Sequence, residues 1–364
     1  MSSRARDPWL DNAKMALVTL VVIGHTWTLL PDEGLSRHLY DFLYAWHVPA
    51  FVLVTGYLSR SFSYAPERLW QLVRTVLVPY VVFECLMSLF RVHVGGEKLE
   101  DLFADPHWPM WYLAALFFWR LLTPVFRPLP AGVPVAVVIS VAAGLWAGDT
   151  LDVARVLGLL PFFVVGLKCT PERLERLRGA IPATLAVGFF VALWFLARYT
   201  DDLAQTEWLY YRALYSELDV SDSRAVVTRL CLLAIGVVGS LAFLALVPRR
   251  GGWFARMGGA TLVVYLLHGF AVKALEYSSF PGWAVDHPGP ALAAATAGAV
   301  ALSLLLASPP VFRFASHLVD PLGSAEKQVT EAVGITAVAQ EVEQETEHGD
   351  RLEQAPPGRD LADR

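Results

Sequence analysis

Charge is what this sequence has least of. Lys, Arg, Asp and Glu make up 17% of its 364 residues, whereas apolar residues make up 55%, and the mean hydropathy is +0.46. Soluble domains carry about 25% charged residues. So little charge over so long a chain excludes an ordinary soluble globular protein, and we expect no nucleic-acid partner.

Cysteine is scarce as well. Cys85, Cys169 and Cys231 fall within or at the ends of apolar runs, and their spacing matches no metal site. We expect them to be structural rather than disulfide-forming, and we expect no metal. The alternating segments of about ten residues that build a transmembrane β-barrel are also missing.

Long apolar runs are present instead. A membrane-spanning helix needs about 20 predominantly apolar residues, and runs of this kind recur along the chain. The ten predicted spans are 9–30, 40–58, 69–91, 108–126, 132–148, 152–168, 180–199, 225–247, 258–277 and 290–312. The sequence therefore predicts an all-α fold, a polytopic membrane protein built as a bundle of about ten transmembrane helices.

Basic residues predict the orientation of these spans. With the N-terminus inside, thirteen Lys and Arg residues fall in inner loops and flanks and six in outer ones. Because such an excess marks the cytoplasmic side, both termini are expected in the cytoplasm. Residues 1–312 form the predicted membrane domain, and the acidic segment 313–364 is predicted to be a disordered tail. The expected location is a bacterial plasma membrane.

Ionisable side chains inside the predicted spans are the candidates for function, because a charge in hydrocarbon costs about 2.5–3.5 kcal/mol. His25, His47, Glu84 and His268 fall roughly 7–14 Å below the outer ends of their spans at about 1.5 Å per residue. One polar chamber in the outer half could hold all four. Two alternatives stay open: His25 hydrogen-bonds a neighbouring helix, or Glu84 and His268 form an interhelical pair without chemistry.

The first predicted span carries its polar residues on one face. Lys14 and His25 are eleven residues apart, and eleven steps of about 100° return to within about 20° of the start. Asp11 lies three residues before Lys14 and can pair with it. This face suits a long, thin ligand with an anionic head, although Lys14 at a span end can also snorkel to lipid headgroups. Arg120 and Arg155, near the ends of their spans, are interpreted as interfacial anchors.

Five stretches, in chain order, resemble motifs of the acyltransferase-3 family of integral membrane acyltransferases. They are WLDNAKMALVTLVVIGHTW, LYAWHVPAFVLVTGYLSRS, LVPYVVFE, HWPMWYLAALFFWRLL and TLVVYLLHGF. The resemblance covers about residues 6–312. Within the family, the chain looks most similar to carbohydrate O-acetylases of the fucose-acetylase type.

The resemblance implies a membrane-embedded O-acyltransferase that takes an acetyl group from cytoplasmic acetyl-CoA. Such enzymes pass the acyl group to a hydroxyl of a glycan or glycolipid. The family's essential histidine matches His25, and its basic residue eleven positions earlier matches Lys14. One departure concerns an Arg-x-x-Arg pair that follows the second span in relatives. Here its nearest match is Gln71 to Arg74, with Arg68 upstream.

The site hypothesis combines the residues with the resemblance. The residues expected to form the CoA-binding site are Asp11, Lys14, Arg68 and Arg74, and the three basic residues among them are expected to hold the CoA phosphates. The expected catalytic residues are His25, His47 and Glu84, and the expected acceptor-binding residues are Trp111, Tyr112 and His268. In this hypothesis His25 is either the general base or a transient acyl carrier, and neutral imidazole suits the first role near pH 7.

Two other functional classes stay open. A transporter or flippase for a lipid-linked sugar would use the same polar layer as a path, but the sequence shows no paired broken helices in two halves. A scaffold that recruits partners through the acidic tail would leave the histidines unexplained. The expected partners of the enzyme are acyl-CoA, a glycan or glycolipid acceptor and the lipid bilayer, and a homo-oligomer is left open.

Overall fold

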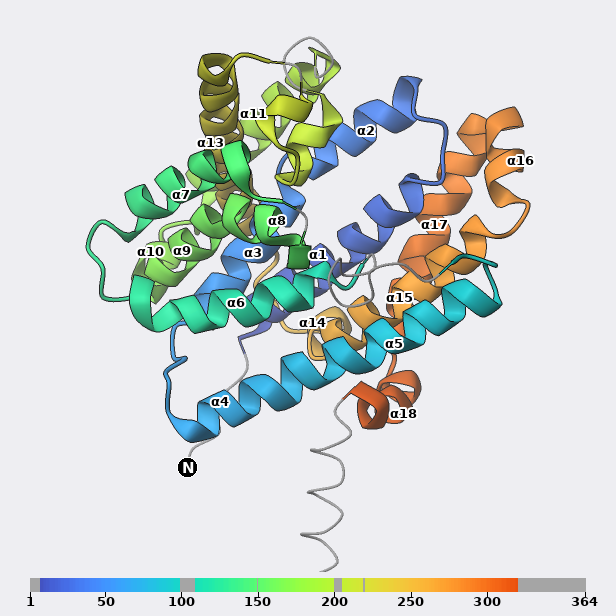
Figure 1. Ribbon diagram of the computed structural model, residues 1–364, viewed down its shortest axis with the longest axis horizontal. Helices are drawn as coiled ribbons and strands as arrows, with labels where there is room; N and C mark the ends of the chain where they lie inside the picture. The colour runs from blue at the N-terminus through green and yellow to red at the C-terminus, as the bar shows by residue number, and fades with distance from the viewer. Residues whose placement is uncertain (1–6, 99–108, 149, 200–204, 219, 320–364) are drawn as a thin grey trace, which may run out of the picture.

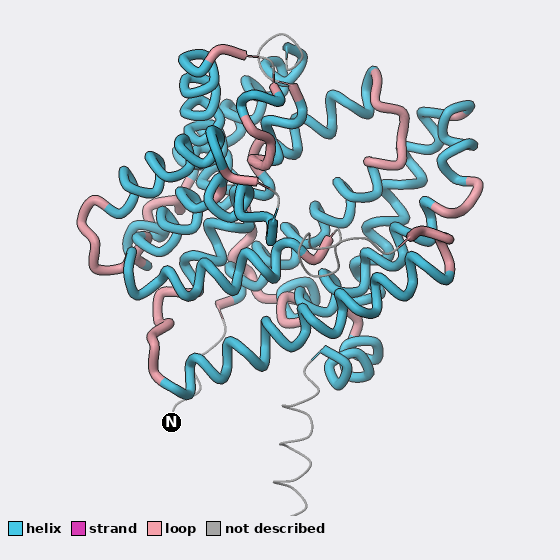
Figure 2. The backbone as a smooth tube through the Cα atoms, viewed as in Figure 1, coloured by secondary structure: helices cyan, strands magenta, loops and turns pink. Residues whose placement is uncertain are grey.

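The computed structural model describes residues 7–98, 109–148, 150–199, 205–218 and 220–319, and within these ranges it contains helices and no strands (Figures 1 and 2). The all-α prediction is therefore confirmed. The α-helices are α1 (Pro8–Trp27), α2 (Gly34–Tyr44), α3 (His47–Leu58), α4 (Pro66–Leu72), α5 (Val78–His93), α6 (Trp111–Phe126), α7 (Gly132–Trp146), α8 (Val153–Gly158), α9 (Leu160–Lys168), α10 (Pro171–Glu175), α11 (Ala180–Leu196), α13 (Asp222–Leu246), α14 (Trp253–Met257), α15 (Thr261–Glu276), α16 (Phe280–Asp286), α17 (Pro288–Leu306) and α18 (Pro309–Val319).

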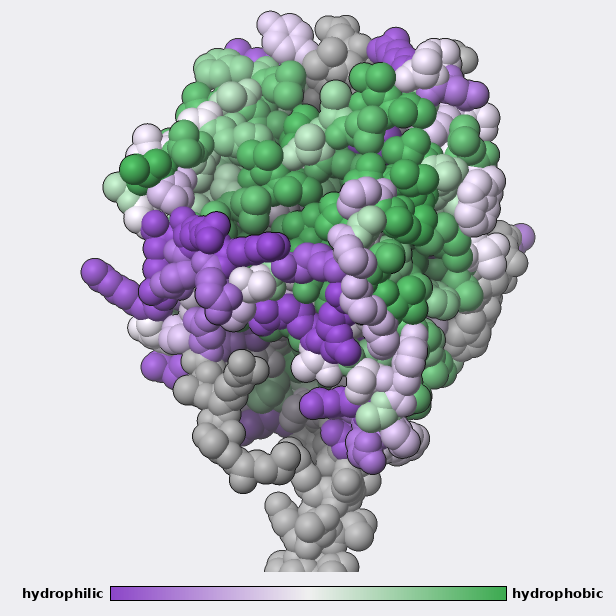
Figure 3. All heavy atoms as spheres, turned by 90° about the vertical axis from the view of Figure 1, so that its left-hand side faces the viewer, coloured by the Kyte–Doolittle hydropathy of each residue, from purple (hydrophilic) through white to green (hydrophobic). Residues whose placement is uncertain are grey.

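Several helices have the length and composition of membrane spans. Within the described residues these are Pro66–His93, Ala180–Tyr199, Asp222–Leu246 and Pro288–Leu306, with Thr150–Gly158 and Leu160–Lys168 as a fifth if that bent pair is one span. The prediction of a polytopic membrane protein is confirmed, while the count of ten spans stays a prediction. The apolar surface is visible in Figure 3, where hydrophobic side chains form a broad face above a band of polar ones.

The second predicted span, 40–58, is two helices rather than one. α2 ends at Tyr44 and α3 begins at His47, and Trp46 between them has φ −141° and ψ −26°. Pro49 has no N–H to donate to the carbonyl of Ala45, and its ring clashes with that carbonyl in a continuous helix. The break therefore places His47 at the first position of α3.

The sixth predicted span, 152–168, is also broken. α8 and α9 meet at an angle of 53°, and Pro161, the second residue of α9, cannot supply the backbone N–H that would continue α8. Before α8, Leu151 and Asp152 have φ of 53° and 52°, a left-handed conformation that is uncommon for non-glycine residues. This break brings polar groups into the bundle.

Two glycines allow α3 and α9 to cross closely. A Cβ atom at Gly56 would lie 2.0 Å from the carbonyl oxygen of Phe163, and one at Gly166 would lie 1.9 Å from that of Leu53. Small residues permit this approach of two backbones where lipid gives little drive for helix association. The pair forms part of a core around α1, which also packs against α14, α15 and α17 (Figure 1).

The described chain ends in α18. This helix runs past residue 312, where the sequence places the domain boundary, to Val319. The rest of the predicted acidic tail, residues 320–364, lies outside the described residues.

Candidate functional site

Two histidines from distant parts of the chain meet beside the last turn of α1. Nδ1 of His25 lies 2.9 Å from Nε2 of His268 on α15, a hydrogen-bonding distance. Their rings are stacked, with centroids 5.1 Å apart and planes 19° from parallel. His268 is fully buried and His25 is 7% exposed. Two of the four groups that the sequence placed in one buried layer thus touch.

Helix carbonyls fix the direction of this hydrogen bond. Nδ1 of His268 lies 2.6 Å from the carbonyl oxygen of Tyr265 and 3.2 Å from that of Val264. Because a carbonyl only accepts, Nδ1 of His268 carries a proton, and in the uncharged ring Nε2 is bare. That bare nitrogen accepts the Nδ1–H of His25, so the lone pair of the His25 ring lies on Nε2. The pair presents His25 Nε2 as a base or nucleophile.

The other two members of the predicted layer are buried as well. Glu84 on α5 is fully buried, and His47 is 1% exposed. Nδ1 of His47 lies 2.9 Å from the Leu43 carbonyl oxygen, so it donates to the preceding helix, and its ring meets Tyr44 edge-on. The ring in hydrogen-bond geometry with His25 is that of His268. The sequence analysis had assigned His268 to the acceptor pocket, and His47 and Glu84 to the catalytic residues beside His25.

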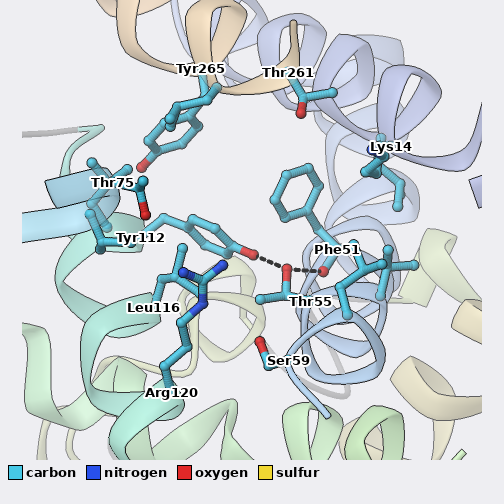
Figure 4. A pocket seen from close by; sticks show the side chains of 16 residues that line it. Lys14, Phe51, Thr55, Ser59, Thr75, Tyr112, Leu116, Arg120, Thr261 and Tyr265 are labelled. Atoms are coloured by element: carbon cyan, nitrogen blue, oxygen red, sulfur yellow. Dashed lines mark hydrogen bonds between the residues drawn. The ribbon is translucent and has the colours of Figure 1, made fainter. Parts of the chain in front are cut away.

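A cavity of about 270 Å³ lies below this histidine pair, between α1, α3, α6 and α15 (Figure 4). A π-helix at Val73–Leu77, between α4 and α5, supplies Thr75 and Val76 to its wall. Such π segments occur frequently at functional sites. The polar residues that line the cavity are Lys14, Thr55, Ser59, Thr75, Tyr112, Arg120, Thr261 and Tyr265.

Aromatic rings connect this cavity to the histidine pair. Tyr112 and Tyr265 both line it, and their ring centroids are 5.6 Å apart. The Tyr112 hydroxyl is hydrogen-bonded to that of Thr55, and the Tyr265 hydroxyl donates to the Pro109 carbonyl. Tyr265 in turn lies one helical turn from His268, with ring centroids 5.8 Å apart. A ligand in the cavity therefore ends one aromatic contact away from the pair.

Cations lie at the end of the cavity that is opposite the histidines. Nζ of Lys14 is 2.7 Å from Oδ1 of Asp11, the pairing that the sequence suggested. Arg120 points into the cavity from α6, across from Ser59 and Thr55 (Figure 4). The sequence interpreted Arg120 as an interfacial anchor, because its position near a helix end is typical of one. The position of Arg120 in the cavity wall follows from tertiary packing, since α3 and α6 line the same cavity.

Arg68 and Arg74, the other residues expected at the CoA phosphates, are not among the described residues that line this cavity. Arg68 is exposed and donates to the side chain of Gln71 at 3.2 Å. Of the residues expected at the acceptor, Tyr112 lines the cavity, whereas Trp111 faces a different group, the guanidinium of Arg155.

Arg155 is a second cation that sequence reasoning missed. Its guanidinium carbon lies 4.5 Å from the centroid of the Trp111 ring, and Nη1 is 3.6 Å from Oδ2 of Asp152. It is close enough to His25 for an electrostatic interaction. In the sequence Arg155 comes shortly after "GDTLD", near the start of the predicted span 152–168, so it is expected at the end of a membrane span. The break before Pro161 is what brings it inside.

The comparison with known families agrees with this geometry. A family model described as an acyltransferase domain matches residues 7–308. The chain belongs to the acyltransferase-3 family. The match to this acyltransferase domain extends from α1 through α17, so it includes both histidines, the cavity and the broken span.

One curated relative in the comparison is the nodulation protein NolL of Mesorhizobium japonicum. It is 30% identical to this acyltransferase-3 chain over 178 residues, which are 44% of this chain and 47% of NolL. The matched region thus spans about half the length of that relative. No solved structure matches the chain.

Proposed function

We propose that this protein is a membrane-embedded O-acyltransferase. It moves an acetyl group from cytoplasmic acetyl-CoA to a hydroxyl of a glycan or glycolipid on the outer side of a bacterial plasma membrane. Family membership supports acyl transfer as the chemistry. The observation that carries the finer proposal is the His25–His268 pair, a buried imidazole with a directed lone pair, located above a cavity whose far end is cationic.

In this proposal the donor enters from the cytoplasmic side. Lys14 and Arg120 hold phosphates of CoA, with Arg68 and Arg74 on the approach, and Asp11 orients Lys14. The pantetheine arm follows α1 past Phe51 and Tyr112, which both line the cavity. Its thioester then arrives beside Tyr265, one turn below the histidine pair.

The chemical step needs a base and a way to stabilise the oxyanion. As a base, Nε2 of His25 takes the proton of the acceptor hydroxyl while its oxygen attacks the thioester carbonyl. The C–S bond then breaks, and the thiolate of CoA leaves and takes up that proton. As a carrier, Nε2 attacks the thioester carbonyl first, the C–S bond breaks and the thiolate of CoA leaves. In a second step the acceptor oxygen attacks the acyl carbon and displaces the imidazole, and the proton of the acceptor hydroxyl goes to the thiolate. In both routes His268 holds the His25 ring with the lone pair on Nε2, and His47 and Glu84 line the same buried layer.

The transporter alternative gains one observation, the broken pair α8 and α9. Transporter sites are built from discontinuous helices in corresponding positions of two repeated halves. In the described part of the chain one such bent pair, α8 and α9, has the length and composition of a membrane span. The α8–α9 break and the α2–α3 break do not by themselves make the repeat on which alternating access depends, so we keep acyl transfer as the proposal.

Radiolabelled transfer tests the proposal directly. Membranes that contain the protein are incubated with acetyl-CoA labelled in the acetyl group, and the lipid and glycan fractions are counted. Mass spectrometry of surface glycans from cells with and without the gene then identifies the acetylated molecule. We expect label in one of these fractions and a missing acetyl group without the gene. A labelled fraction that is unchanged by His25→Ala would contradict the proposal.

A further inference from the structure

Unusual backbone geometry is concentrated at the broken span. Within the described residues, Leu151, Asp152 and Tyr211 are the non-glycine residues with positive φ. Leu151 and Asp152 lead into α8, and Tyr211 packs against its end, because a Cβ at Gly158 would lie 2.6 Å from the Tyr211 carbonyl oxygen. Residues in sparsely populated conformations gather at ligand sites and active sites. The three of them flank one group of side chains.

That group consists of a carboxylate between two guanidinium groups. Asp152 lies 3.6 Å from Arg155 and 3.9 Å from Arg212. The side chain of Asp152 is 2% exposed, that of Arg155 is 14% exposed and that of Arg212 is 35% exposed. The cluster therefore leads from the surface to the interior of the bundle.

Its inner end faces the histidine pair through aromatic rings. Arg155 lies over Trp111 at 4.5 Å, and it interacts electrostatically with Tyr44, Tyr265 and His25. Tyr44 packs against α1 at the residue before His25, since a Cβ at Gly24 would lie 3.0 Å from the Tyr44 ring. These contacts place Arg155 near His25, and Arg155 is not among the described residues that line the cavity with Lys14.

The side chains of this cluster are suited to binding several hydroxyl groups of one ligand at the same time. A carboxylate accepts from O–H groups, and the rigid fork of a guanidinium donates to two oxygens together. An indole face can cover the apolar side of a sugar ring. A single hydroxyl would need only one of these partners.

We infer that Asp152, Arg155 and Trp111 form the acceptor site, which binds a polyhydroxylated ring and presents one of its hydroxyls to His25. This inference rests on the proposed function, since it names the residues that hold the acceptor of the same reaction. Arg212 forms the outer edge of the site.

The test compares two acceptors of similar chain length in a detergent without sugar. Octyl glucoside carries a ring of hydroxyls, and octanol carries one. The purified full-length protein is given labelled acetyl-CoA with each, and KM and kcat are measured. We expect Arg155→Gln and Asp152→Asn to raise KM for octyl glucoside by about tenfold or more and to change KM for octanol less than about twofold. Arg155→Lys keeps the charge but loses the fork, so its effect should be intermediate.

Controls separate this site from folding and from the donor site. Arg212→Gln, at the partly exposed edge, should raise KM for octyl glucoside without lowering the thermal unfolding midpoint. Arg198→Gln, an exposed outer arginine, should leave both acceptors unaffected. Arg120→Gln should raise KM for acetyl-CoA instead.

The possible results separate the acceptor-site inference from the proposed O-acyltransferase function. An unchanged KM for octyl glucoside in Arg155→Gln overturns the inference, as does an equal loss with octanol, which would mean that Arg155 stabilises the oxyanion. Wild-type transfer to octanol alone overturns the inference and keeps the proposed function. Transfer to neither acceptor counts against both.

Discussion

The two ends of α1 hold their ionisable side chains in different environments. Near the N-terminal end of α1, which we call its foot, Lys14 is partly exposed, with 24% of its side chain accessible. It is paired with the neighbouring carboxylate of Asp11. Eleven residues later, His25 is buried and is held by a ring from α15 that backbone carbonyls orient. The foot keeps a mobile charge near water, whereas the other end fixes an uncharged ring in one orientation.

Under the proposed function, this difference corresponds to a division of labour between donor binding and the chemical step. A flexible ammonium on a long stem suits the binding of phosphates, which tolerates small displacements. Proton transfer needs a donor–acceptor distance of about 2.6–3.2 Å and a defined lone pair. Changes at the foot should therefore alter binding of the donor, and changes at the histidines should alter the rate of the chemical step.

The largest effect is expected for His25→Ala. Removal of a positioned base or nucleophile lowers the rate by about 10²–10⁴-fold. Initial rates of acetyl transfer at saturating acetyl-CoA measure kcat, and size-exclusion chromatography checks that the variant is folded. His287→Ala changes an exposed histidine between α16 and α17; it is a matched control and should keep its rate. A rate for His25→Ala within tenfold of wild type would remove His25 from the chemistry.

His268→Ala should have the next largest effect. It leaves Nδ1 of His25 without its acceptor, so we expect kcat to fall by about 10–100-fold with KM for acetyl-CoA nearly unchanged. In His268→Gln the amide oxygen can accept from His25 at nearly the same place, so part of the rate should return. Equal losses in the two variants would mean that His268 fills space rather than orients the ring.

Much of this arrangement could be predicted from the sequence. The predictions that failed concern helix breaks and contacts between helices. Apolar run lengths located the helices, and an eleven-residue spacing put Lys14 and His25 on one face. The breaks near Pro49 and Pro161 were missed because apolar runs continue through them. Arg120 and Arg155 were interpreted as anchors from their positions near span ends, although tertiary packing brings one into the cavity and the other beside Trp111. Which ring contacts His25 depends on how α15 packs on α1, a contact that no local pattern records.

At the foot, Lys14→Ala and Arg120→Gln should raise KM for acetyl-CoA by about 5–20-fold each, with kcat within about twofold, because each removes a charge-assisted contact of roughly 1–2 kcal/mol. Steady-state kinetics with varied acetyl-CoA measures this. Raising the salt concentration should reduce the difference between variant and wild type, since exposed charges are screened. A lower kcat with an unchanged KM would contradict the division of labour.

The smallest effect is expected away from both ends, at Glu97. Hydrogen bonds from Arg91, followed by that from Tyr277, lower the pKa of Glu97 to about 2. Because this pKa is depressed, the stabilisation is present above the unfolded pKa and is lost as the pH falls toward 2. Glu97→Gln should cost about 1 kcal/mol or less at pH 7, with no change in either KM. Thermal unfolding at several pH values measures it, and a cost that disappears already at pH 6 would contradict this assignment.

The protonation pattern of His25 tests the account most directly. With ¹⁵N-labelled histidine, NMR of the protein in lipid or detergent, compared with His25→Ala to assign the signals, distinguishes a protonated ring nitrogen from a bare one. We predict that at pH 7 His25 is uncharged, with the proton on Nδ1 and a bare Nε2, and that His268 has the same tautomer. A proton on Nε2 of His25 would contradict the claim that His268 directs this ring toward acyl transfer.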